Sequence, residues 1–304
     1  MNFLTKKSGA FASLLLCVFL AACEKEMAIS VGPNQPLLVV EAYINNLLPQ
    51  YNYVVLSQSQ DFFSSNFQST PVSNAIVTVT EGEYNGSGGY LWNNNSTVRL
   101  QEANTDSVPA SISQGLYFDQ RLYSNRPAAL KGIVGKAYLL NINVAGENYS
   151  AITRLVTPVD IDSLTQGFAF INDTKDTLYR ITNHYHDPDT LGNAQFYFWG
   201  YSETRQSFGW GSFTKSRAPG TDDLSNGQYI QLTHPQGFYK TDTINYFMAS
   251  ITRDVYNFWD SYNKAKDNNG PFSTPVNLLT TVKGNNATGC FSGMALSNKR
   301  LIIR

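Results

Sequence analysis

Two histidines and two aspartates lie close together in the middle of the chain. His184 and His186 are separated by one residue, and Asp187 and Asp189 follow them directly. Residues two positions apart point to the same face of a β-strand. Imidazole and carboxylate groups are ligands of Zn²⁺ and Cu²⁺, so His184 and His186 are candidate metal ligands. The alternative is a strand end at which polar residues enter a loop.

The sequence lacks the motifs of the common catalytic sites. It contains no G-x-S-x-G nucleophile elbow, no H-E-x-x-H zinc motif and no glycine-rich phosphate loop after a strand. The neighbouring acids Asp160 with Asp162 and Asp222 with Asp223 are of the residue type used in acid–base catalysis, but such pairs are common in polar loops. We therefore expect a protein that is not an enzyme and needs no cofactor.

A run of aromatic residues is a candidate platform for carbohydrate. Tyr197, Trp199 and Tyr201 alternate along one predicted strand and so share a face, and Trp210 follows in the sequence. Exposed rings of this kind stack on sugars. The alternative, which we favour, is a strand buried on both faces, as between a sheet and a helix.

The N-terminus has the order of features of a bacterial lipoprotein signal peptide. Lys6 and Lys7 precede the ten apolar residues Phe11–Leu20, and the sequence Leu-Ala-Ala-Cys ends at Cys23. The apolar run is shorter than the roughly 20 residues that cross a bilayer. The L-A-A-C sequence resembles the lipobox, whose cysteine receives lipid before cleavage. We therefore expect residues 1–22 to be removed and Cys23 to anchor the chain in a membrane.

The composition and charge limit the fold classes and the classes of partner that fit the sequence. The chain of 304 residues carries 22 basic and 23 acidic side chains, and 13% of its residues are aromatic. A balanced charge without a basic cluster argues against nucleic acid as a partner. Aromatic residues together with many Asn, Ser, Thr and Gly favour short β-strands joined by polar turns. Once residues 1–22 are removed and Cys23 is lipidated, Cys290 is the only other cysteine, and we expect it to be buried.

The pattern of apolar residues predicts a mainly β protein with two domains. Residues 23–36 lack apolar periodicity and form a tether. Residues 37–157 contain about seven short strands, such as Ala75–Thr80, which predicts an immunoglobulin-like or transthyretin-like β-sandwich. The glycine within Ala145–Asn148 predicts a hairpin turn between two of these strands. Residues 158–304 form a second β-rich domain. One helix is expected at about 251–265, because four apolar residues recur there at helical spacing: Val255, Phe258, Trp259 and Tyr262.

The order of several segments resembles one known family. The segments are LLVVEAYINN, YVVLSQS, SNAIVTVTEG, KAYLLNINVAGENYSAIT, TPVDIDSL, YRITNHYHDPDTLGNAQFYFW and, near the end, YNFWDSY, GPFSTPVNLLTTVKGN and GCF. Together they resemble the Bacteroidota lipoprotein family called domain of unknown function 4249. The chain departs from the family at Asn285 and Asn286, where glycine is frequent. The family has no established enzymatic activity, and its members are often encoded beside TonB-dependent transporter barrels.

A short repeated motif suggests modification. Five Asp-Ser/Thr-aliphatic triplets resemble the O-glycosylation acceptor of Bacteroidota envelope proteins, with hydroxyls on Ser107, Ser163, Thr177, Thr190 and Thr243. Ser107 and Thr190 are the candidate acceptors, because both are expected in loops.

These observations predict a function without fixing a ligand. The lipid anchor, the missing catalytic motifs and the family resemblance favour a surface-exposed outer-membrane lipoprotein that assists a TonB-dependent transporter. The first alternative is a glycan-binding or adhesive surface module that uses the four aromatic residues. The second alternative is a metal-binding envelope protein that uses His184 and His186.

Overall fold

The computed structural model describes residues 36–60, 70–104, 113–171, 174–201, 218–268 and 276–304, without the side chains of residues 199–201, 218 and 219. Residues Pro36–Arg304 form one compact unit. Cys23, Ser107 and Trp210 lie outside the described residues, as do the side chains of Trp199 and Tyr201.

Most of the strands belong to one large sheet of 13 strands. Its order is β12-β11-β14-β16-β1-β2-β6-β5-β3-β7-β8-β15, and β4 pairs with β3. The first half of the chain supplies β1 (Leu38–Asn45), β2 (Tyr53–Gln58), β3 (Ile76–Tyr84), β4 (Tyr90–Trp92), β5 (Val98–Glu102), β6 (Leu116–Phe118), β7 (Lys136–Val144) and β8 (Glu147–Arg154). The second half supplies β11 (Ala194–Tyr201), β12 (Ala218–Thr221), β14 (Thr243–Ile251), β15 (Val282–Lys283) and β16 (Ala287–Ile302).

A smaller sheet and a few helices complete the described fold. The smaller sheet has the order β13-β10-β9, with β9 (Ser163–Ile171), β10 (Thr177–His186) and β13 (Tyr229–Thr233). The α-helices are α3 (Arg121–Ser124) and α4 (Arg253–Asp267), and the 3-10 helices are η1 (Pro49–Tyr51), η2 (Asn94–Ser96) and η3 (Arg126–Ala128). The mainly β class predicted from the sequence is confirmed, and the curled large sheet is compatible with a sandwich-like fold.

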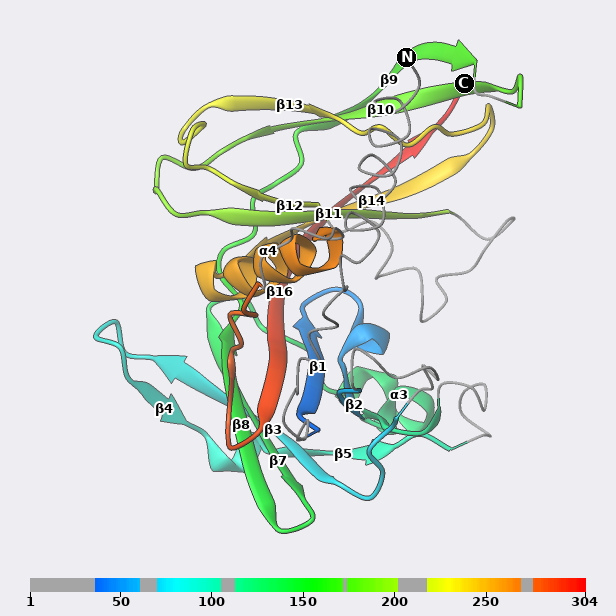
Figure 1. Ribbon diagram of the computed structural model, residues 1–304. Coiled ribbons are helices and arrows are strands. Elements are labelled where there is room, and N and C mark those ends of the chain that lie inside the picture. The colour runs from blue at the N-terminus through cyan, green and yellow to red at the C-terminus, as the bar shows by residue number, and fades with distance from the viewer. Residues whose placement is uncertain (1–35, 61–69, 105–112, 172–173, 202–217, 269–275) are drawn as a thin grey trace, which may run out of the picture. The chain divides into compact units, whose positions relative to one another are not determined.

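Strand β16 connects the two halves of the chain. Its first half pairs in parallel with β1, from Leu38 beside Ala287 to Asn45 beside Met294. Its second half pairs antiparallel with β14, which belongs to the C-terminal half of the sequence. Figure 1 shows β16 running from β1 in the lower part of the molecule to β14 in the upper part. The domain boundary predicted between residues 157 and 158 therefore falls inside one compact unit.

Two local predictions are confirmed by the backbone. The helix expected at about 251–265 is α4, and Thr252 occupies its N-cap position. The hairpin turn expected within Ala145–Asn148 joins β7 to β8 through Ala145 and Gly146, which have positive φ of 51° and 86°. This is the backbone of the tight turns that favour Gly, and its twist matches that of the flanking strands.

Three groups of buried apolar residues lie against these elements. The first core lies around α4 and includes Tyr43, Phe198, Phe258, Trp259 and Cys290. The second core lies on the other face of β1 and includes Val40, Ile44, Leu56, Leu140 and Phe291. The third core lies around β10 and β14 and includes Ile181, Tyr197, Phe238, Tyr246 and Met248.

His234 is buried beside the third core and is expected to make the protein sensitive to acid. Its Nε2 shares a hydrogen bond of 2.7 Å with the Tyr246 hydroxyl, and burial lowers the pKa of the imidazole from 6.5 to about 4. Between these two pH values the His234 imidazole binds a proton in the unfolded chain but not in the folded chain. The free energy of unfolding therefore falls as the pH drops from 6.5 to 4, by at most about 3 kcal/mol from this residue.

Urea unfolding at about pH 7 and about pH 4 measures this effect. The substitution His234→Gln should shrink the difference in unfolding free energy between the two conditions. The matched control is His186→Gln, because the His186 side chain is 71% exposed. A wild-type difference that His234→Gln leaves unchanged would show that other groups cause the acid sensitivity.

Candidate ligand-binding site

Strands β1 and β16 form the floor of a pocket. In their parallel register Val39 lies beside Thr288 and Glu41 lies beside Cys290. Because side chains alternate along a strand, these four point to the same face. The intervening Val40 points the other way, into the second core. The floor is thus one face of a two-strand ladder whose other face is fully packed.

Helix α4 forms the wall of the pocket. Val255, Phe258, Trp259 and Tyr262 recur at intervals of three and four, which places them on one helix face. The Trp259 Nε1 donates a hydrogen bond of 3.0 Å to the Ser292 hydroxyl, and so attaches the helix to β16. Asp254 in the first turn, and Lys264 and Lys266 in the last, suit the helix dipole.

The helix and the floor separate toward the C-terminal end of α4. Along the inner face, the exposed fraction rises from 1% at Val255 to 9% at Trp259 and 42% at Tyr262. The resulting hollow has a volume of about 300 Å³, which is at the lower end of the range for small-molecule sites. It is lined by Val39, Val40, Glu41, Phe258, Trp259, Tyr262, Asn263, Lys266, Leu278, Thr288, Gly289 and Cys290.

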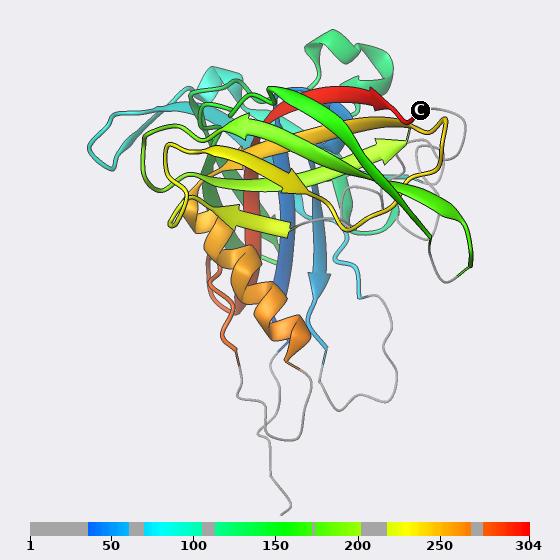
Figure 2. The same cartoon turned by 90° about the horizontal axis from the view of Figure 1, so that it is seen from above.

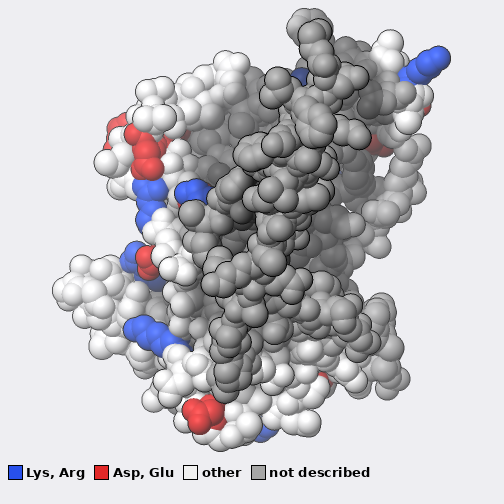
Figure 3. All heavy atoms as spheres, viewed as in Figure 1, with Lys and Arg blue, Asp and Glu red and all other residues white. Residues whose placement is uncertain are grey.

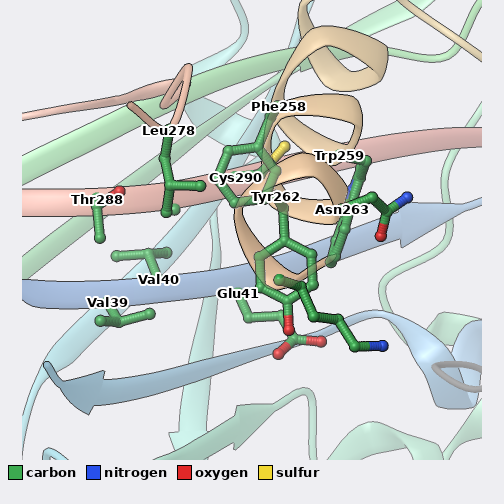
Figure 4. A pocket seen from close by; sticks show the side chains of 12 residues that line it. Val39, Val40, Glu41, Phe258, Trp259, Tyr262, Asn263, Leu278, Thr288 and Cys290 are labelled. Carbon is green, nitrogen blue, oxygen red and sulfur yellow. The ribbon is translucent and has the colours of Figure 1, made fainter. Parts of the chain in front are cut away.

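The lining is mostly apolar, with a few polar groups. Figure 4 shows the Phe258, Trp259 and Tyr262 rings on the helix side and the carboxylate of Glu41 below Tyr262. The Tyr43 hydroxyl donates a hydrogen bond to that carboxylate. Lys266 and Asn263 add a cation and an amide from the helix. Such a lining suits a small molecule with an apolar body and a polar or charged group.

The thiol of Cys290 lies in the wall of this pocket. Cys290 is 2% exposed, as expected for a small buried residue. Its sulfur accepts a weak hydrogen bond of 3.4 Å from the Ser292 hydroxyl.

Charged side chains are mixed on the surface. On the face in Figure 3, basic and acidic residues alternate among the described atoms, and neither sign gathers into a patch. Among the described residues, no helix has both the length and the apolar character needed to cross a membrane.

A comparison with protein families finds a match that includes all the elements forming the pocket. A family model described as "Domain of unknown function (DUF4249)" matches residues 24–300, which include β1, α4 and the pocket-forming part of β16. The chain belongs to the DUF4249 family. No curated protein matches the chain.

In this DUF4249 chain Tyr197 is buried, as the favoured interpretation of the aromatic run expects, and forms no exposed platform. Tyr197 is 6% exposed and its hydroxyl shares a hydrogen bond of 2.9 Å with that of Tyr185. Phe196 and Phe198, on the opposite face of β11, are buried as well. The strand is covered on both faces at these positions, because the first core packs on one side and the third core on the other.

The two histidines of β10 form their hydrogen bonds with residues other than Asp187 and Asp189. The His184 ring nitrogens are hydrogen-bonded to Thr165 and Tyr229, at 2.7 and 2.9 Å. His186 Nδ1 pairs with Asp162 at 2.7 Å. The described residues contain no group of three or more His, Cys, Asp or Glu that could hold a metal ion.

Asp187 does not join the histidines because it turns inward. It is 6% exposed, and its carboxylate accepts a hydrogen bond from the Gly227 amide at 3.2 Å. Burial raises the pKa of Asp187, and the nearby charge of Asp222 raises it further. Asp222 in turn accepts hydrogen bonds from the amides of Gly192 and Asn193. These two carboxylates hold two loops together.

Thr190 is exposed in the loop between β10 and β11, where a glycan could be accommodated. Its candidacy as an acceptor stays a prediction, as does that of Ser107. The pocket residues Val39, Glu41 and Thr288 were not singled out as a site from the sequence. The available signal was that the lining residues Leu278, Gly289 and Cys290 belong to the GPFSTPVNL and GCF sequences that carry the family resemblance.

Proposed function

We propose that the protein is a non-enzymatic lipoprotein of a Bacteroidota outer membrane, anchored through Cys23, which assists a TonB-dependent transporter. Its task is to bind a small, partly apolar ligand in the pocket under α4 and to hold it near the transporter. The pocket is the observation that carries this proposal. It combines an aromatic wall, a firm strand floor and polar groups, within a volume of about 300 Å³.

The sequence between the anchor and the fold supports the accessory role. Thirteen residues lead from Cys23 to Pro36, where the compact unit begins. At ~3.3 Å per residue, such a tether reaches at most about 45 Å. A protein confined this closely to a membrane has a high effective concentration toward a neighbouring membrane protein. Even a weak contact with a transporter is then populated.

Filling the pocket should strongly weaken ligand binding. The probe is N-phenyl-1-naphthylamine, whose fluorescence rises when it enters an apolar pocket. Residues 24–304 without lipid retain the whole compact unit and need no detergent. We expect the wild-type chain to bind the probe at one saturable site. Thr288→Trp places an indole on the floor beside Val39 and should weaken binding more than about tenfold.

The matched control is Thr165→Trp, which places the same indole at an exposed position on β9. It should leave probe binding unchanged. Equal binding by the Thr288→Trp chain, or no saturable binding by the wild-type chain, would contradict the assignment of the pocket as the ligand site.

A further inference from the structure

The hairpin of β3 and β4 carries a strip of aromatic rings distant from the pocket in sequence. Tyr84 and Tyr90 lie directly opposite each other, and Trp92 lies opposite Gly82. The ring centroids of Tyr84 and Tyr90 are 5.5 Å apart, and those of Tyr90 and Trp92 are 5.2 Å apart. The three rings therefore form a continuous row on one face of the hairpin.

Features of the hairpin backbone fix the positions of the three rings. A Cβ at Gly82 would lie 2.4 Å from the Trp92 ring, so only glycine lets the indole lie across β3. The turn is fixed by Asn85, whose side-chain oxygen accepts hydrogen bonds from the amides of Ser87 and Gly89, at 3.0 and 2.9 Å. The rings are thus held in place before any ligand arrives.

The strip is accessible and has a charged neighbour. Tyr84 is 37% exposed, and Tyr90 and Trp92 are half-buried. The Arg154 guanidinium lies over the Tyr84 ring, 4.3 Å from its centroid. In both Figure 1 and Figure 2 the hairpin extends from the body of the molecule at one edge.

We propose that this strip binds a carbohydrate. Sugar rings present apolar C–H faces between hydroxyl groups, and tyrosine and tryptophan pair an apolar ring with a polar atom. Arg154 and Asn85 supply hydrogen-bonding groups at the end of the row where the hydroxyls of a bound sugar would lie.

The size of the strip favours a sugar over a protein. A stable protein partner buries about 800 Å² on each side, which three partly exposed rings do not provide. A short row of rings instead suits a few sugar units laid end to end. This inference is independent of the pocket and of the transporter.

Native gels that contain a polysaccharide test the proposal. The full chain would be run through gels with soluble starch, hydroxyethyl cellulose, xylan or dextran. We expect at least one polysaccharide to retard the wild-type protein. Tyr90→Ala and Trp92→Ala should weaken the retardation at least about fivefold. Tyr123→Ala should not, although Tyr123 is also exposed, at 62%.

A conservative variant separates binding from folding. Trp92→Phe keeps a ring over Gly82 and should retain part of the retardation even if Trp92→Ala unfolds the hairpin. Migration unaffected by all four polysaccharides would overturn the proposal, and so would equal retardation of the wild-type chain and a folded Tyr90→Ala variant.

Discussion

Gly289→Ala is expected to lower the free energy of unfolding by more than about 3 kcal/mol. Gly289 lies in β16 beside Val40 of β1, with a φ of 129°. A Cβ there would lie 1.9 Å from the Val40 carbonyl oxygen and 2.7 Å from its carbonyl carbon. Both neighbours are backbone atoms, so no side-chain rotation relieves the clash. The parallel pairing that joins the two halves of the chain would have to open.

Urea unfolding followed by circular dichroism measures this loss. The matched control is Gly88→Ala, because Gly88 also has a positive φ, 93°, but nothing lies within 4 Å of the added Cβ. The control should cost only about 1 kcal/mol, the penalty of the backbone conformation alone. A Gly289→Ala chain as stable as the Gly88→Ala chain would show that β1 and β16 are not in close contact.

Cys23→Ala is expected to move the protein from the membrane fraction to the soluble fraction almost completely. Each buried CH₂ of an acyl chain contributes about 0.8 kcal/mol to membrane binding, and two or more chains anchor a protein stably. Without the thiol no lipid is added. Fractionation of expressing cells, followed by mass spectrometry of the N-terminal peptide, measures both the location and the modification.

Cys290→Ala is the control for this experiment, because Cys290 is buried in the fold. It should stay in the membrane fraction with its N-terminal lipid intact. A Cys23→Ala protein that remains with the membranes, or a wild-type N-terminus without lipid on Cys23, would refute the anchor.

The regular elements of the fold could be predicted because their signals are local. The stripe from Val255 to Tyr262 indicates α4, and Ala145-Gly146 indicates the β7–β8 hairpin. Pairing between β1 and β16 could not be predicted in the same way. It joins residues about 250 positions apart, such as Leu38 and Ala287, and no local pattern records which strand lies beside which.

The pocket could not be predicted from the sequence for the same reason. Its floor and wall come from β1, α4 and β16, which are far apart in the sequence, and Tyr262 in its lining is 42% exposed. The aromatic residues around Tyr197 favoured a strand buried on both faces, but no local pattern shows that the third core is what covers Tyr197. Asp187 likewise follows His186 in the sequence yet points into the protein, away from the expected metal ligands.

We propose above that the protein is lipid-anchored and works beside a transporter. Affinity purification of the tagged full-length lipoprotein in a mild detergent tests it most directly, with Cys23→Ala as the comparison. We expect a large outer-membrane β-barrel to copurify with the wild-type protein in near-stoichiometric amounts, and far less with the variant. Recovery of the wild-type protein alone from the same membranes would overturn the proposed partnership.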